Sequence, residues 1–179
     1  MKIRTFLLFI CPSLLTAQTD LQKLVDSLKY ITDMPYICET GNGEGCGDRL
    51  FWKVVQQKEA AIPLLIARLS DATATAATVP YFGGQWAVGD VAYSALSEII
   101  RDIPTFDLLG VPFDTRDCGY CAYWNHLRKR HKNRRQFKAA VSKWYESNKT
   151  SLVWVASDEF LTCDCTGKHP NGGHFELKK

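Results

Sequence analysis

The chain lacks the short motifs that mark common enzyme chemistry. It has no Gly-x-Ser-x-Gly turn, no His-Glu-x-x-His pair and no glycine-rich phosphate loop. Its four histidines all lie in the last third, and none has a carboxylate partner at a fixed spacing. The sequence therefore gives no support for a serine hydrolase, a zinc protease or a phosphate-loop nucleotide hydrolase, and the protein is expected not to be an enzyme.

Charge of one sign is not in excess either. The chain has 22 Lys and Arg against 19 Asp and Glu, a formal net charge of +3. Proteins that bind nucleic acid or membranes by overall charge carry a larger imbalance, so there is no strong case for a nucleic-acid partner. After the N-terminal residues no apolar run is long enough to cross a bilayer, and we expect no transmembrane segment in the mature chain.

The N-terminus has the layout of a secretory signal. A basic start precedes an apolar run over residues 6–15, and Ala17 supplies the small residue where a signal peptidase would cut. That run is too short for a permanent membrane anchor. We expect residues 1–17 to be a signal peptide and the exported protein, periplasmic or secreted, to begin near Gln18.

Six of the seven cysteines follow this signal, and an even number in an exported chain favours disulfide bonds. They are Cys38, Cys46, Cys118, Cys121, Cys163 and Cys165. The Cys-x-Cys pair stands too close for an easy bridge within itself, so the Cys-x-x-Cys pair supplies its natural partners. The first two cysteines would close their own glycine-rich loop.

The same thiols offer two alternatives. Thiolates at Cys118, Cys121, Cys163 and Cys165 can surround one tetrahedral zinc ion, with His126, His169 or His174 as substitute ligands. The Cys-Gly-Tyr-Cys segment also resembles the active-site motif of thioredoxin-like proteins, which implies thiol chemistry. No strand pattern leads into that motif. We expect no cofactor if the cysteines are oxidised, and zinc in the alternative.

Helical periodicity dominates the middle of the chain. Apolar residues recur at three- and four-residue spacing in five segments: 21–31, 50–55, 60–69, 87–100 and 121–144. Asp48 is placed to cap the second of these helices, and Pro63 is tolerated in the first turn of the third. Residues 70–86 and 104–120 read as loops.

The last residues follow a different pattern. Residues 152–155 are strand-like, the Cys-x-Cys pair is compact, and residues 169–174 read as a turn. The sequence therefore predicts a mainly α fold. A compact helical domain spans residues 18–150, and a short irregular or β, cysteine-containing tail, residues 151–179, packs on that domain.

One stretch resembles a known repeat family. Ile62, Leu65 and Leu69, followed by Asp71, are similar to the first helix and turn of a HEAT-type repeat, and residues 88–99 are similar to the second. The resemblance covers residues 60–100 only, and the segment between the helices is longer than the family's tight turn. It implies a helical hairpin within the domain, and a scaffold or protein-binding role.

A basic run is the first candidate binding surface. Residues 128–138 hold seven Lys and Arg and no acid, and Arg128, Lys132 and Arg135 share one side at helical spacing. Such a patch suits a polyanion such as an acidic glycan, a lipid head group or nucleic acid. The alternative is a solvated helix face, which the near-neutral mature charge favours.

An aromatic loop is the second candidate. Tyr81, Phe82 and Trp86 surround two glycines, an arrangement that can stack a sugar ring or grip a peptide. The alternative, which we favour, is that these rings cover the helix pair as core. Taken together, the sequence predicts an exported, non-enzymatic interaction or envelope-associated module whose partner is another protein or an envelope component. The alternative function is a zinc-binding or thiol-active protein.

Overall fold

The computed structural model describes residues 12–34, 47–79, 83–101, 103–112, 119–159 and 168–178. The α-helices are α1 (Pro12–Asp26), α2 (Arg49–Val55), α3 (Ile62–Arg68), α4 (Val88–Ile99), α5 (Thr105–Leu109), α6 (Gly119–Lys129) and α7 (His131–Asn148). Short 3-10 turns are η1 (Ser27–Tyr30), η3 (Lys58–Ala61) and η4 (Lys149–Ser151). The strands are β1 (Ala74–Thr78), β2 (Gln85–Ala87), β3 (Leu152–Ala156) and β4 (Gly173–Leu177). The fold is mainly α with a strand-containing tail, as the sequence predicts.

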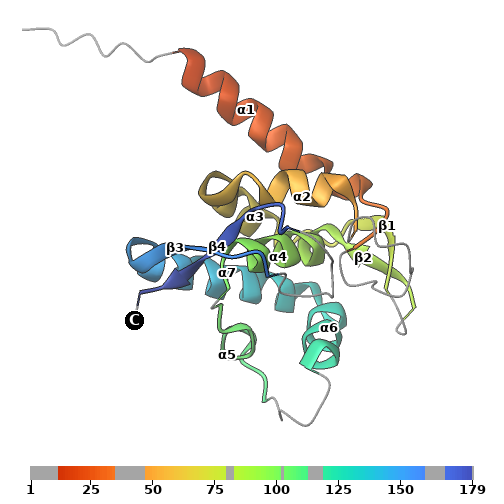
Figure 1. The fold of residues 1–179 in the computed structure, drawn as a ribbon. Coiled ribbons are helices and arrows are strands. Elements are labelled where there is room, and N and C mark those ends of the chain that lie inside the picture. Colours follow the sequence, from red (N-terminus) through yellow and green to blue (C-terminus); the bar gives the residue numbers. More distant parts are fainter. Residues whose placement is uncertain are drawn as a thin grey trace, which may run out of the picture.

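The most deeply buried helix, α4, contacts α2, α3, β2 and β4. Figure 1 shows it inside the body, with α2 and α3 on one side and α7 on the other. Its segment combines small and branched apolar residues, so the neighbouring helices approach closely. At Gly89 the approach is so tight that a Cβ would lie 2.5 Å from the Leu69 carbonyl oxygen. The helix therefore forms the core that the other elements share.

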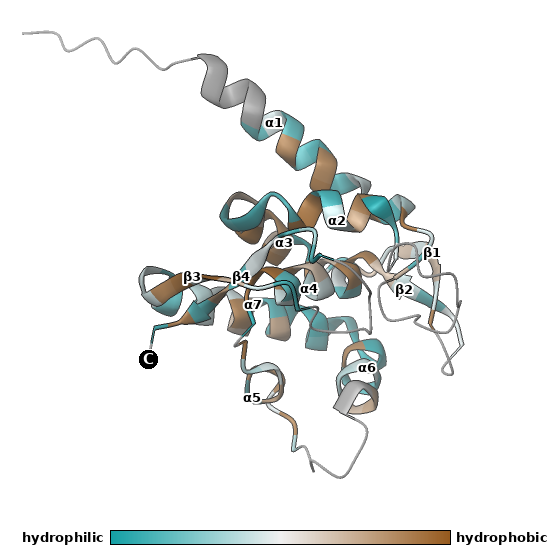
Figure 2. Cartoon of the chain, viewed as in Figure 1, coloured by the Kyte–Doolittle hydropathy of each residue, from teal (hydrophilic) through white to brown (hydrophobic). Residues whose placement is uncertain are grey.

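Several helix boundaries follow from their caps, as expected. The Asp48 carboxylate accepts a hydrogen bond from the Leu50 N–H at 2.8 Å and caps α2. Pro63 lies in the first turn of α3, where the missing N–H costs nothing. Figure 2 shows that the helices mix hydrophobic and hydrophilic residues, as elements around one shared core do.

The prediction of a loop over residues 70–86 is wrong. Strands β1 and β2 form an antiparallel hairpin there, in which Ala74 pairs with Ala87 and Thr78 pairs with Gln85. Residues along β1 alternate between exposed and buried, with Thr75 and Ala77 inside. Alanine and threonine differ so little in hydropathy that the alternation left no visible sequence pattern. This hairpin lies between α3 and α4, where a HEAT-type repeat has a tight turn.

A short helix was also missed. Residues 105–109 form α5 within the stretch predicted to be irregular, and Gly110 ends it in the left-handed conformation with φ of +65°. The Tyr93 hydroxyl on α4 hydrogen-bonds Thr105 at its start. Five residues are too few for a periodic pattern, so this helix forms only because its neighbours fix it.

The C-terminal tail is held more firmly than expected. Strand β3 matches the predicted strand, and β4, which the sequence did not reveal, pairs with it from Leu152–Leu177 to Ala156–Gly173. The Phe175 carbonyl accepts a hydrogen bond from the Arg101 N–H at 3.0 Å, next to the end of α4. Backbone hydrogen bonds therefore tie residues 173–177 to β3 and to the end of α4.

Helix α1 runs across the expected cleavage point after Ala17. Figure 1 shows its N-terminal part extending away from the body, while Val25 near its end is fully buried. Within the described ranges, no helix combines the length and apolar character that crossing a membrane requires.

Candidate functional site

A buried ion pair joins α4 to α7. Arg134 Nη1 donates to Asp90 Oδ1 at 2.7 Å and Nη2 donates to Oδ2 at 3.0 Å, a bidentate pair with side chains 6% and 0% exposed. Oδ2 of Asp90 also accepts the Ala87 N–H at the start of α4. Burial works against the charged guanidinium, but the hydrogen bonds that Arg134 donates to Asp90, together with the Asp90 charge, outweigh it and raise the pKa of Arg134.

An aromatic cluster joins α4, α6 and α7. The Tyr93 ring stacks on Tyr123 of α6 with centroids 5.4 Å apart, and it meets Phe137 of α7 edge-on at 4.9 Å. Burial raises the pKa of the Tyr93 phenol to about 12. These contacts fix α6 and α7 against α4.

The basic run divides into two groups with different roles. Arg134 is buried, and Lys138 donates to the Ala67 carbonyl at 2.8 Å, which docks α7 against the end of α3. The other members are exposed: Arg128, Lys129, Arg130, Lys132 and Arg135. None of these five forms an ion pair within the described residues. We call these five residues the basic corner.

The basic corner spans the turn between α6 and α7. Arg130 has extended backbone between the two helices, and the Asn133 side-chain amide donates to the His126 carbonyl at 2.7 Å across it. Arg135 Nη1 and the His131 ring lie 3.2 Å apart on the first turns of α7. No acidic residue occurs between Asp117 and Glu146, so nothing in the adjacent sequence neutralises these cations.

The Arg128 side chain is exposed, yet two contacts hold its guanidinium in place. Its guanidinium lies 4.4 Å from the centre of the Trp124 ring, and its Nη1 donates to the Gly83 carbonyl at 3.3 Å. A Cβ on Gly84, where φ is +84°, would lie 2.6 Å from Arg128 Nη2. The glycine in the hairpin turn is thus what lets the arginine pack against it.

A pocket of about 350 Å³ opens beside Arg128. It is lined by Ala72, Ala74, Gln85, Ala87, Arg128 and Arg134. Ala74, Gln85 and Ala87 come from the hairpin strands, and the two arginines come from α6 and α7. Because Arg134 is already paired with Asp90, Arg128 is the lining residue whose charge has no ion-pair partner among the described residues.

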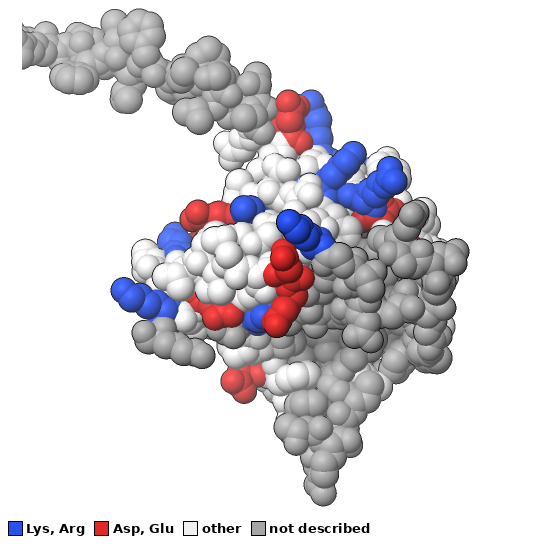
Figure 3. All heavy atoms as spheres, in the orientation of Figure 1, with Lys and Arg blue, Asp and Glu red and all other residues white. Residues whose placement is uncertain are grey.

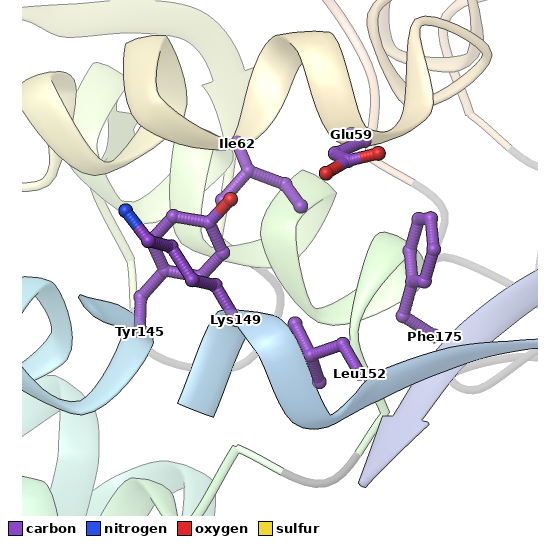
Figure 4. Close-up of a pocket in the computed structure, with 6 residues that line it drawn as sticks. All are labelled: Glu59, Ile62, Tyr145, Lys149, Leu152 and Phe175. Atoms are coloured by element: carbon purple, nitrogen blue, oxygen red, sulfur yellow. The ribbon is translucent and has the colours of Figure 1, made fainter. Parts of the chain in front are cut away.

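A second cavity, of about 70 Å³, lies where the tail meets the helices. Figure 4 shows its lining side chains converging from η3, α3, α7, η4 and the tail strands. Burial, followed by the nearby Glu59 charge, raises the pKa of the Tyr145 phenol. Lys149 is engaged with Glu146 at 2.6 Å. The volume is far below that of usual ligand sites, so this cavity is a packing gap.

The tail carries a buried histidine. His169 Nε2 lies 3.1 Å from Glu98 Oε2, with side chains 3% and 2% exposed, and Nδ1 accepts the Asn171 N–H at 3.0 Å. Accepting that bond requires Nδ1 to be unprotonated, so Nε2 carries the proton and donates to the carboxylate. Both ring nitrogens are occupied, which leaves none for the zinc site suggested as an alternative.

The other proposed metal ligands are placed as follows. His174 Nε2 lies 2.6 Å from Glu176, and His126 is half-buried on α6. Cys121 takes part in a disulfide bond. The remaining disulfide candidates, Cys38, Cys46, Cys118, Cys163 and Cys165, lie outside the described residues. In the described ranges, no group of three or more His, Cys, Asp or Glu side chains has the arrangement of a metal site.

Trp86 belongs to the core rather than to a ligand loop. It is 2% exposed, its Nε1 donates to the Thr78 carbonyl at 3.0 Å, and its ring meets Trp124 edge-on at 5.2 Å. Tyr81 and Phe82 lie outside the described residues. The Trp86 ring instead fixes the hairpin beneath Trp124, and so supports the seat of Arg128.

The sequence analysis identified Arg128, Lys132 and Arg135 but missed two buried acids, Asp90, which pairs with Arg134, and Glu98, which pairs with His169. Both acids lie on α4, which is buried at nearly every residue. An acidic residue within such a helix signals a buried partner, and that signal was available in the sequence.

No protein-family model, curated protein or solved structure matches this chain. Figure 3 shows Lys and Arg side chains interspersed with Asp and Glu over the coloured part of one face. The run of unpaired cations at the basic corner is the exception to that mixing within the described sequence.

Proposed function

We propose that this protein is an exported, non-enzymatic interaction module that binds an acidic component of the cell envelope through the basic corner. The observation that carries the proposal is the seating of Arg128 between Trp124 and the hairpin turn. An exposed guanidinium usually loses rotamer freedom on binding. One that is already held in place loses less of that freedom, and Arg128 lies beside four further cations that form no ion pair among the described residues.

Export is supported by two independent features. The N-terminal pattern is that of a secretory signal, and the disulfide at Cys121 is typical of a protein from an oxidising compartment. The same disulfide counts against a zinc or thiol-active centre built on Cys121, because both need the reduced thiol.

Reversing the charge of the corner tests the proposal. The variant Arg128→Glu, Lys132→Glu, Arg135→Glu should elute from immobilised dextran sulfate at much lower salt than the unmodified protein, because the charges that bind the sulfates are lost. Its melting temperature should change little, since exposed substitutions usually cost about 0.5 kcal/mol or less each.

A matched control separates the corner from net charge. Arg49, Lys53 and Lys143 are exposed and form no ion pair among the described residues, and reversing them changes the total charge equally. This control should elute almost as the unmodified protein does. Equal losses in both triple variants would show that overall charge, and not the basic corner, governs retention, and would contradict the proposal.

A further inference from the structure

We infer that the pocket beside Arg128 binds one anionic sugar unit of an acidic polysaccharide. This inference rests on the proposed function and names the chemical class of the acidic partner. The pocket and the basic corner meet at Arg128, which lines the one and belongs to the other. A ligand that fills the pocket therefore continues directly onto the unpaired cations.

The pocket has the size of a site for one sugar ring. Its volume of about 350 Å³ lies within the usual range for small ligands. Three of its described lining residues are alanines, Ala72, Ala74 and Ala87. A pyranose ring presents a face of C–H groups, which packs on alanine methyl groups by dispersion.

The polar groups of the pocket match one negative charge and neighbouring hydroxyls. The planar guanidinium of Arg128 suits a carboxylate or sulfate, which it binds with two parallel hydrogen bonds. The exposed Gln85 amide both donates and accepts, as hydroxyl partners require. Arg134 adds no second free cation because Asp90 pairs with it, so the pocket favours a singly charged unit.

The remaining cations indicate a polymer rather than a single sugar. Lys129, Arg130, Lys132 and Arg135 lie outside the pocket lining, and they are exposed. One charged sugar occupies Arg128 alone and leaves these four without a ligand. A chain that repeats its charge along its length places further anions near them. An acidic peptide would also satisfy the cations, but it would make no use of a ring-sized pocket.

Filling the pocket is the direct test. Ala74→Leu puts a larger side chain in the lining of the pocket. Ala76→Leu is the matched control, because Ala76 is exposed on the same strand but is not a lining residue. Titration calorimetry should compare an oligogalacturonate hexasaccharide, which carries one carboxylate on each ring, with poly-L-glutamate. Ala74→Leu should weaken hexasaccharide binding by about tenfold and leave poly-L-glutamate binding unchanged. The control should bind both as the unmodified protein does.

Moving Arg128 without changing its charge is the second test. Gly84→Ala should displace the guanidinium, whereas a Cβ on Gly83, which also has positive φ (+68°), meets no atom within 4 Å. We expect Gly84→Ala to weaken hexasaccharide binding several-fold more than Gly83→Ala. Melting temperatures of the two variants should be similar, because both carry a comparable backbone strain.

The outcomes separate the two proposals. Hexasaccharide binding that survives Ala74→Leu unchanged would overturn the pocket inference, even if the triple charge reversal abolished binding. Equal losses for the hexasaccharide and poly-L-glutamate would overturn it as well, since only the cations would then be used. If the triple reversal and its control bind dextran sulfate alike, the proposed function itself fails.

Discussion

Arg134 is the residue whose role the sequence disguises most. It lies in the middle of a run of cations, next to the exposed Arg135, yet it is buried and bidentate on Asp90. Helical spacing explains the difference, because consecutive residues on α7 point about 100° apart and only one faces α4. The basic run therefore contains buried residues that hold the fold together and exposed residues that are available to a ligand.

Removing Arg134 should strongly destabilise the protein. Arg134→Met leaves the Asp90 carboxylate buried without its partner, which typically costs about 3–5 kcal/mol. Arg135→Met is the matched control and should cost about 0.5 kcal/mol or less, since that side chain is exposed. Urea denaturation followed by circular dichroism measures both. Similar midpoints for the two variants would show that Asp90 is solvated or has another partner.

At the scale of elements, the longer helices and strand β3 were predictable, whereas the short helix α5 and strands β1, β2 and β4 were not. The helical segments over 60–69 and 87–100 have strong apolar periodicity and appear as α3 and α4 within a few residues. Hairpin β1–β2 was missed because its inward residues are alanine and threonine. Strand β4 was missed because its burial depends on a glycine and on a histidine paired with Glu176, neither of which reads as apolar.

The candidate site shows the same division. Exposed cations at helical spacing are visible in sequence, so Arg128, Lys132 and Arg135 were found. The pocket beside Arg128 is not visible, because it requires the hairpin, which packs against α6 through Trp86 and Trp124. The HEAT-type resemblance stays a prediction: α3 and α4 do contact each other, but a hairpin separates them.

Strand β4 should depend on Gly173. Its φ is +150°, and a Cβ there would lie 2.2 Å from the Val155 carbonyl oxygen. Gly173→Ala should therefore destabilise the protein by about 3 kcal/mol. Gly172→Ala also has positive φ (+67°) but meets no atom, and about 1 kcal/mol is expected.

Hydrogen exchange locates this effect. In Gly173→Ala the β3–β4 amides should lose protection, while α4 keeps its slow exchange. Equal protection of β3 and β4 in the two glycine variants would show that the close contact with Val155 does not hold the tail.

At the scale of the whole molecule, export and oxidation should appear together. Protein purified from its native host without reductant should begin near Gln18, and its mass should correspond to six oxidised cysteines. Peptide mapping by mass spectrometry checks both and identifies the partner of Cys121. A retained Met1 would contradict export. Four free thiols with one bound zinc ion would favour the zinc alternative.

Helix α4 affects the order in which the protein folds during synthesis. Its two buried carboxylates find their partners 44 and 71 residues further along, at Arg134 and His169. During synthesis, the N-terminal half therefore holds a helix with two acids that it cannot bury alone. Stable closure waits until the last strand has emerged, and long-range closure of this kind is slow. Such a delay would suit the export that we propose, because a chain that is not yet stably folded can pass through a narrow secretion channel.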